Sequence, residues 1–148
     1  MAMTTAETDR VRANTAEDVN ARLDEEARAR VESFRGASAS ALTARMDELR
    51  REWDIERYLQ LNAASFAGTG VLLATLHDRR WLAVPAIVLP FLLMHAVQGW
   101  CPPVAVFRRY GVRTRREIDR EIYALKALRG DFATDDAWEA ARAGPSRA

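Results

Sequence analysis

The sequence predicts an all-α membrane protein, in which two transmembrane helices form a hairpin and amphipathic helices flank it on both sides. The first observation is a stretch without any charged residue, Tyr58–Leu76. The second is Trp81–Trp100, which has no formal charge at neutral pH and has a tryptophan at each end. The third is that charged residues are dense on either side of this region, while the region itself holds only three of them: Asp78, Arg79 and Arg80.

The segment before the hairpin divides into a tail and an arm. Residues 1–14 are polar, and we expect a flexible tail there. Residues 15–57 are predicted to form a cytoplasmic amphipathic helical arm, because Thr15 followed by Asp18 is typical of a helix start. Apolar residues then recur at spacings of four, three and four, which fits a helix lying in solvent or on lipid, or alternatively one paired with another helix. They are Leu42, Met46, Leu49 and Trp53.

Residues 58–107 are predicted to form the transmembrane hairpin, with spans at about 58–76 and 81–100. A helix of about nineteen residues rises about 28 Å, close to the thickness of the hydrocarbon core of a bilayer. Tryptophans at both ends of the second span match the two interfacial belts. In water these helices would need a covering shell, which no other apolar segment of this short chain supplies. Pro90 predicts a kink that membrane helices tolerate.

The distribution of arginine predicts the orientation. Arginines are concentrated before the first span and after the second, whereas the link carries only Arg79 and Arg80. We therefore expect a multi-pass protein of the bacterial inner (cytoplasmic) membrane with both termini in the cytoplasm. Residues 108–148 are predicted to be a basic membrane-surface segment followed by cytoplasmic helices. The arginines beside the span favour anionic lipid headgroups over nucleic acid as their partner; they are Arg108, Arg109, Arg113, Arg115 and Arg116.

A further helix is predicted at Arg115–Arg129. Thr114 and Glu117 have the spacing of a capping box, and Gly130 marks the end of the helix. Its apolar stripe consists of Ile118, Ile122 and Leu125. A short last helix containing Trp138 is expected after Thr134.

His95 is the ionisable side chain inside the predicted spans, and such residues are candidates for function. One interpretation is a ligand for haem or a chlorophyll-type magnesium, or a proton relay. The favoured interpretation is structural. In an antiparallel hairpin, His95 and Asn62 are predicted to lie at the same depth in the membrane, and Gln60 and Gln98 at nearly the same depth as each other. Each pair could therefore form a hydrogen bond between the spans. Close helix contact is also expected at two pairs of small residues four apart, Ala64 with Gly68 and Gly70 with Ala74.

The single cysteine, Cys101, cannot form an internal disulfide or a multi-thiolate metal site. It lies at the cytoplasmic end of the second span, where a thiol could be lipidated, oxidised or accept sulfur, but an unreactive small residue is the favoured interpretation. We find no phosphate-binding loop, no metal-ligand cluster and no nucleophile with a base. The acidic residues are assigned to solvated helix faces, so no catalytic residue and no cofactor is predicted.

The segment "GWCPP" together with "RRYGVRT" resembles the YgaP-like inner-membrane domain family, a two-span hairpin of unknown function. The resemblance covers about residues 55–116, and Tyr110 replaces the family's usual leucine. It implies a hairpin with cytoplasmic termini that is often dimeric through its spans. No rhodanese active-site loop accompanies it, so sulfurtransferase activity does not carry over. The matching residues are Gly99, Cys101, Pro102, Gly111 and Thr114.

These patterns predict a non-enzymatic inner-membrane scaffold or accessory subunit, which docks through its spans onto a larger membrane complex or a second copy. The alternative is a small redox, sulfur-handling or haem-associated component that uses Cys101 or His95. Remodelling of the membrane surface by the amphipathic arms is a third, weaker possibility.

Overall fold

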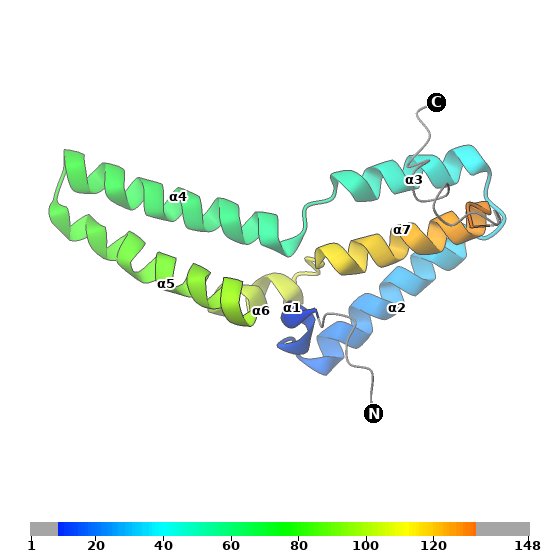
Figure 1. Cartoon of the computed structure of the whole chain (residues 1–148), viewed down its shortest axis with the longest axis horizontal. Coiled ribbons are helices and arrows are strands. Elements are labelled where there is room, and N and C mark those ends of the chain that lie inside the picture. Colours follow the sequence, from blue (N-terminus) through cyan, green and yellow to red (C-terminus); the bar gives the residue numbers. More distant parts are fainter. Residues whose placement is uncertain (1–8, 133–148) are drawn as a thin grey trace. The chain divides into compact units, whose positions relative to one another are not determined.

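The computed structural model of this chain describes residues 9–132, and this part is all-α, without strands (Figure 1). The predicted short helix after Thr134 lies outside the described residues, as do the first eight residues of the predicted tail. The elements in order are α1 (Arg10–Ala13), α2 (Glu17–Ser33), α3 (Ala39–Arg51), α4 (Ile55–Leu76), the 3-10 helix η1 (Arg79–Leu82), α5 (Ala83–Gln98), α6 (Pro102–Arg109) and α7 (Arg115–Arg129).

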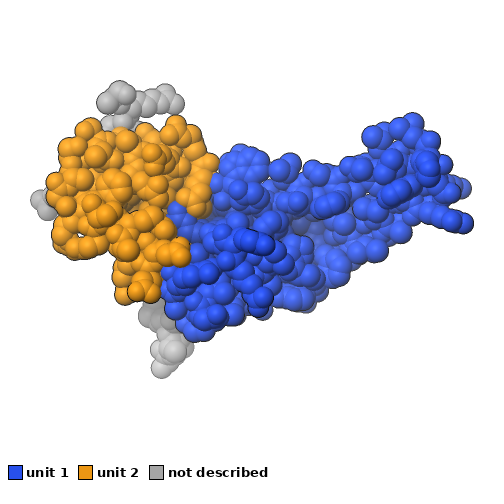
Figure 2. Space-filling model, turned by 180° about the vertical axis from the view of Figure 1, so that it is seen from behind, with its two compact units in different colours: residues 1–23, 53–116 blue, residues 24–52, 117–148 orange. Residues whose placement is uncertain are grey.

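The chain forms two compact units, and each is built from segments that are separated in the sequence (Figure 2). Unit 1 comprises residues 1–23 and 53–116, which include α1, α4, η1, α5 and α6. Unit 2 comprises residues 24–52 and 117–148, which include most of α2, all of α3 and most of α7. The division therefore does not follow the predicted order of tail, arm, hairpin and basic segment.

Unit 1 contains the predicted hairpin. Asp54 starts α4, because its Oδ1 accepts a 2.9 Å hydrogen bond from the backbone N–H of Arg57. Asp78 starts η1 in the same way through a 2.7 Å bond from Arg80 N. The chain reverses within this short link, so α4 and α5 pack side by side and antiparallel (Figure 1).

The two long helices approach each other closely at Gly70. A Cβ atom there would lie 2.6 Å from Pro85 Cδ and 2.9 Å from Val84 Cβ, so only glycine fits. Ala64 and Gly68, one of the two pairs expected at a helix contact, are instead exposed, and nothing lies within 4 Å of a Cβ at Gly68. The other expected pair, Gly70 and Ala74, contributes Gly70 to the contact.

Two helical stretches of the described chain are long and apolar enough to cross a membrane: Ala39–Leu76, which includes α4, and Arg79–Gln98. The apolar windows are only 17% and 11% buried within the chain. At about 1.5 Å per residue, α4 is about 33 Å long, which matches the thickness of the hydrocarbon core. Both helices therefore present mostly apolar, uncovered surfaces.

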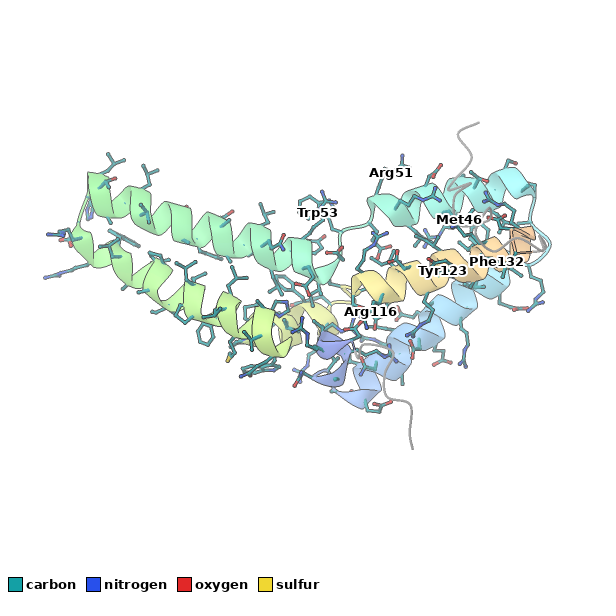
Figure 3. All side chains as sticks on the ribbon, viewed as in Figure 1. Met46, Arg51, Trp53, Arg116, Tyr123 and Phe132 are labelled. Atoms are coloured by element: carbon teal, nitrogen blue, oxygen red, sulfur yellow. The ribbon has the colours of Figure 1, made fainter. Side chains whose placement is uncertain are left out.

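Unit 2 is held by a small apolar core between α3 and α7. Figure 3 shows Met46 on the side of α3 that faces α7. Leu42, Met46 and Leu49 of the predicted stripe are thus paired within the chain, rather than lying in solvent or on lipid. Trp53, its last member, lies beyond the end of α3 and is exposed. Helix α7 has the predicted bounds. The buried core residues are Leu42, Met46, Leu49, Ile118, Ile122 and Leu125.

Candidate functional site

The residues that sequence reasoning singled out gather in unit 1, at the end of the hairpin opposite its link. An apolar cluster joins α1, the start of α4 and α6 at this end, which we call the hairpin base. Its buried members are Val11, Ile55, Leu59, Cys101 and Val104. Burial of such side chains stabilises the base by about 1.5–3 kcal/mol each relative to exposure, so α1 is packed here, and residues 9–14 are not the flexible tail that was predicted.

Helix α1 satisfies the end of α5. The guanidinium of Arg10 donates from Nη1 to the carbonyl oxygens of Ala96 at 3.1 Å and Val97 at 3.0 Å. Asn14 Nδ2 donates to Gln98 O at 3.1 Å. The last carbonyls of a helix have no partner within it and carry partial negative charge, so a cation and an amide are suitable partners.

Gly99 makes this arrangement sterically possible. Its φ of 75° is the left-handed conformation that ends many helices, and a Cβ there would lie 2.4 Å from Arg10 Cβ. Pro102 then occupies the first position of α6, where its missing N–H costs nothing. Thr114 Oγ1 donates to Asp9 Oδ2 at 2.5 Å. These motif residues therefore shape the turn after α5 and hold the start of α1.

Cys101 is buried within the hairpin base rather than presented to solvent. Burial raises the pKa of its thiol above the ordinary value, and the backbone hydrogen bond with Val104 only partly offsets that effect. A protonated, enclosed thiol is a poor nucleophile and a poor metal ligand. This geometry favours the unreactive interpretation of Cys101.

His95 has a different partner from the one predicted. Its Nε2 lies 2.8 Å from Glu56 Oε2, and the side chain is only 4% exposed. Its Nδ1 has no hydrogen-bond partner among residues 9–132. Asn62 Nδ2 donates to Tyr58 O of its own helix, so the predicted Asn62–His95 bond is wrong. Glu56 was missed because the span was taken to begin at residue 58, whereas α4 begins at Ile55 and places Glu56 in its first turn.

The second predicted pair, Gln60 and Gln98, does not form part of the contact between the helices. Both side chains are exposed, although the backbone carbonyl of Gln98 serves as the acceptor for Asn14.

Two of the five arginines assigned to lipid headgroups are buried. Arg108 is 1% exposed and donates to Asn20 Oδ1 at 3.0 Å, to Thr15 Oγ1 at 3.3 Å and to Val112 O at 3.2 Å. Arg113 is also buried, and its carbonyl accepts from Ile55 N. Their role is to hold loops and helices of unit 1 together. Arg109 and Arg116 are exposed and Arg115 is half-buried.

Two cavities adjoin the hairpin base. One, of about 270 Å³, is polar and is lined by residues that include Arg10, Glu56, His95 and Thr114. The other, of about 350 Å³, is an apolar groove between α4, α5 and α6, and Cys101 lies in its wall. No cluster of three potential metal ligands occurs within residues 9–132.

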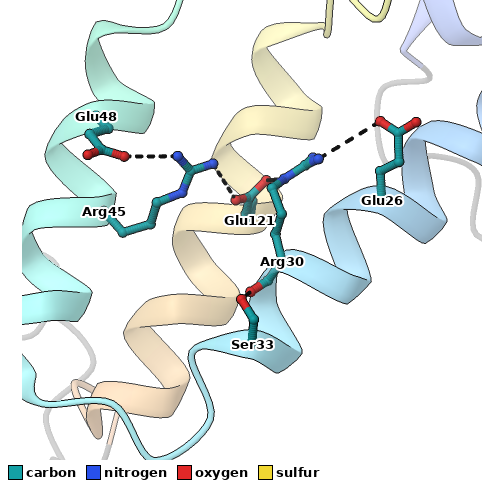
Figure 4. Close-up of polar contacts among 6 residues, drawn as sticks. All are labelled: Glu26, Arg30, Ser33, Arg45, Glu48 and Glu121. Carbon is teal, nitrogen blue, oxygen red and sulfur yellow. Dashed lines mark hydrogen bonds and ion pairs between the residues drawn. The ribbon is translucent and has the colours of Figure 1, made fainter.

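Unit 2 contains a buried polar cluster centred on Glu121 of α7 (Figure 4). The carboxylate, only 1% exposed, is paired with Arg45 of α3 at 3.1 Å and with Arg30 of α2 at 3.2 Å. Assigning all acidic residues to solvated faces was therefore wrong for Glu121. A carboxylate between two guanidinium groups joins three helices through charge-assisted hydrogen bonds.

No family model matches the chain, and comparisons with curated proteins and with solved structures found no match either. The resemblance to the YgaP-like inner-membrane domain family stays a prediction.

Proposed function

We propose that this chain is a non-enzymatic integral protein of the bacterial inner membrane, a scaffold or accessory subunit whose two-span hairpin anchors a small helical unit at the cytoplasmic face. The observation that carries the proposal is the uncovered apolar surface of α4 and α5. The core helix of a water-soluble protein is mostly buried, whereas the apolar windows here are 17% and 11% buried. Lipid or the helices of a membrane partner would cover that surface and remove its apolar side chains from water.

The pairing of α3 with α7 supports the proposed topology. Helix α3 precedes the hairpin and α7 follows it, yet their apolar faces form one core. Two segments can pack together only if they lie on the same side of the membrane, which requires an even number of crossings between them. The arginine distribution favours the cytoplasm as that side.

Docking onto a larger complex or a second copy is supported by the exposed face of α4. Ala64 and Gly68 lie on that face, and small residues four apart allow two helix backbones to approach closely in lipid. The alternative role in redox, sulfur or haem chemistry has less support, because Cys101 is enclosed and His95 is held by Glu56.

Membrane insertion is tested by expressing the full chain and extracting the membranes with alkaline carbonate. We expect the chain to stay in the membrane pellet and to require detergent for solubility. A chain that is monodisperse in detergent-free buffer and does not bind vesicles would overturn the proposal.

Topology is tested with single cysteines in a Cys101→Ser background. A membrane-impermeant maleimide should label Arg79→Cys, in the link, on intact spheroplasts. It should label Ser40→Cys, in the first turn of α3, only after lysis. The reverse pattern, or equal labelling at both positions, would contradict the orientation.

Docking is tested by mild-detergent purification and identification of the proteins that co-purify. Gly68→Leu should reduce the amount of co-purifying partner or dimer, whereas His95→Phe and Cys101→Ser should leave it unchanged. Loss of the assembly in either of the last two variants, with Gly68→Leu unaffected, would favour the redox or haem alternative.

A further inference from the structure

We propose that the apolar groove between α4, α5 and α6 binds one anionic phospholipid, with an acyl chain in the groove and the phosphate at Arg57. The inference deepens the proposed function and rests on the insertion of the hairpin into a membrane. It concerns which lipid this chain selects, beyond the lipid contact that any span makes.

The groove has the size and chemistry of a site for a hydrocarbon chain. Its volume of about 350 Å³ is within the range of small-ligand pockets. Its one amide side chain, Asn62, donates to the carbonyl of Tyr58. The rest of the lining is hydrocarbon, aromatic ring and one thiol, and the principal apolar residues are Leu59, Phe66, Val88, Phe91, Leu92 and Phe107.

A row of aromatic rings leads from the groove to a cation. Phe107, in the wall of the groove, lies 5.8 Å from the ring of Tyr58, and Tyr58 lies 5.4 Å from Trp53. The guanidinium of Arg57 lies over the Trp53 ring, 4.7 Å from its centre. Tyrosine and tryptophan are the side chains that favour the headgroup level of a bilayer. Figure 3 labels Trp53, which precedes α4.

The guanidinium of Arg57 is available to bind an anion. Other arginines of the chain, such as Arg45 and Arg50, pair with carboxylates at 3.0 Å and 2.5 Å. Within residues 9–132, Arg57 is held by an aromatic ring and pairs with no carboxylate, and its side chain is exposed. A guanidinium fixed by a ring keeps its N–H groups for a phosphate, which it binds in a bidentate manner.

Charge complementarity favours a lipid over the helix of a second copy as the occupant. Between residues 58 and 116 the sequence contains a single acidic residue, Asp78, and it lies in the link at the opposite end of the hairpin. Helix α4 of a second copy would also carry Glu56, in its first turn, but that carboxylate is already bonded to His95 of its own chain at 2.8 Å. The spans of a second copy would therefore fill the groove with hydrocarbon and offer Arg57 only a carboxylate that is already engaged. An anionic phospholipid supplies both hydrocarbon and a free negative charge.

The test is native mass spectrometry of the full chain, purified in detergent and incubated with equal amounts of dioleoyl phosphatidylglycerol and dioleoyl phosphatidylcholine. The wild-type chain should retain phosphatidylglycerol about fivefold more than phosphatidylcholine, which corresponds to about 1 kcal/mol for one arginine near the surface. Arg57→Gln should abolish the preference. Arg28→Gln, at an exposed arginine of α2 with no assigned lipid contact, should keep it.

The acyl-chain half of the proposal is tested by filling the groove. Val88→Phe should reduce retention of both lipids, whereas Val71→Phe, at an exposed position outside the lining, should not. Circular dichroism establishes that each variant keeps its helices, and if Val88→Phe does not fold, the Arg57→Gln comparison decides alone.

Equal retention of the two lipids by the wild type, or an unchanged preference in Arg57→Gln, would overturn the proposal. So would a lipid-free dimer that Val88→Phe converts to monomer, because a second copy would then occupy the groove. These results leave the membrane scaffold intact. A chain that needs no detergent would instead remove the proposed function itself.

Discussion

Replacing Gly70 by alanine should weaken the hairpin, whereas the same replacement at Gly68, two residues away on the same helix, should not. The new Cβ at position 70 would lie 2.6 Å from Pro85 Cδ and 3.1 Å from the carbonyl oxygen of Trp81. Neither the proline ring nor the backbone can move without shifting α5. Forcing an extra methyl into a packed contact costs about 1–3 kcal/mol. At position 68 nothing lies within 4 Å of the new atom.

The comparison of the two variants isolates the contact. Any gain from the higher helix propensity of alanine, at most about 1 kcal/mol, is common to both positions and cancels in the difference. Gly70→Ala should therefore be about 1–3 kcal/mol less stable than Gly68→Ala. The assay is loss of helical circular dichroism as sodium dodecyl sulfate is titrated into mild-detergent micelles. Equal stability, or a more stable Gly70→Ala, would refute the packing of α4 on α5 described above.

Three further predictions concern the polar groups. Glu121→Ala should lower the free energy of unfolding by about 1–3 kcal/mol, measured by chemical unfolding, because Arg45 and Arg30 lose their shared carboxylate. Glu48→Ala, at an exposed carboxylate, should change it by less than about 1 kcal/mol. Equal effects of the two substitutions would contradict the cluster. Cys101 should react with iodoacetamide more slowly than the cysteine of Ser40→Cys. Because burial raises the pKa of Cys101, the reactive thiolate forms only at higher pH, and the reaction rate should keep rising above the ordinary thiol pKa. A fast reaction of Cys101 at neutral pH would be inconsistent with burial. Arg10→Ala should speed amide hydrogen exchange in α1 and at the end of α5, because two charge-assisted hydrogen bonds to carbonyl groups are lost. Unchanged exchange would mean that α1 does not cap α5.

The sequence predicted the elements whose determinants are local. The helix from Arg115 to Arg129 was located correctly because its apolar periodicity and the following glycine are encoded within a few residues. The two long apolar helices were found for the same reason, since length and the absence of charge are properties of a continuous stretch.

The hydrogen-bond partners of individual side chains could not be derived in this way. Pairing His95 with Asn62 assumed a span that starts at Tyr58, but the cap at Asp54 starts α4 earlier and brings Glu56 into reach. The burial of Arg108 depends on Asn20 and Thr15, which are far away in the sequence. An arginine that is buried by distant segments has the same local pattern as one that faces lipid.

Unit 2 is assembled from segments on either side of the hairpin, and this has a consequence for synthesis. A nascent chain emerges with Leu42, Met46 and Leu49 before the segment with their partners, Ile118, Ile122 and Leu125, has been translated. The apolar face of α3 therefore stays uncovered while the hairpin is translated. A ribosome that stalls before α7 would leave a fragment with that face open to chaperones and proteases. Completion of the last described helix therefore also protects the first half of the protein from degradation.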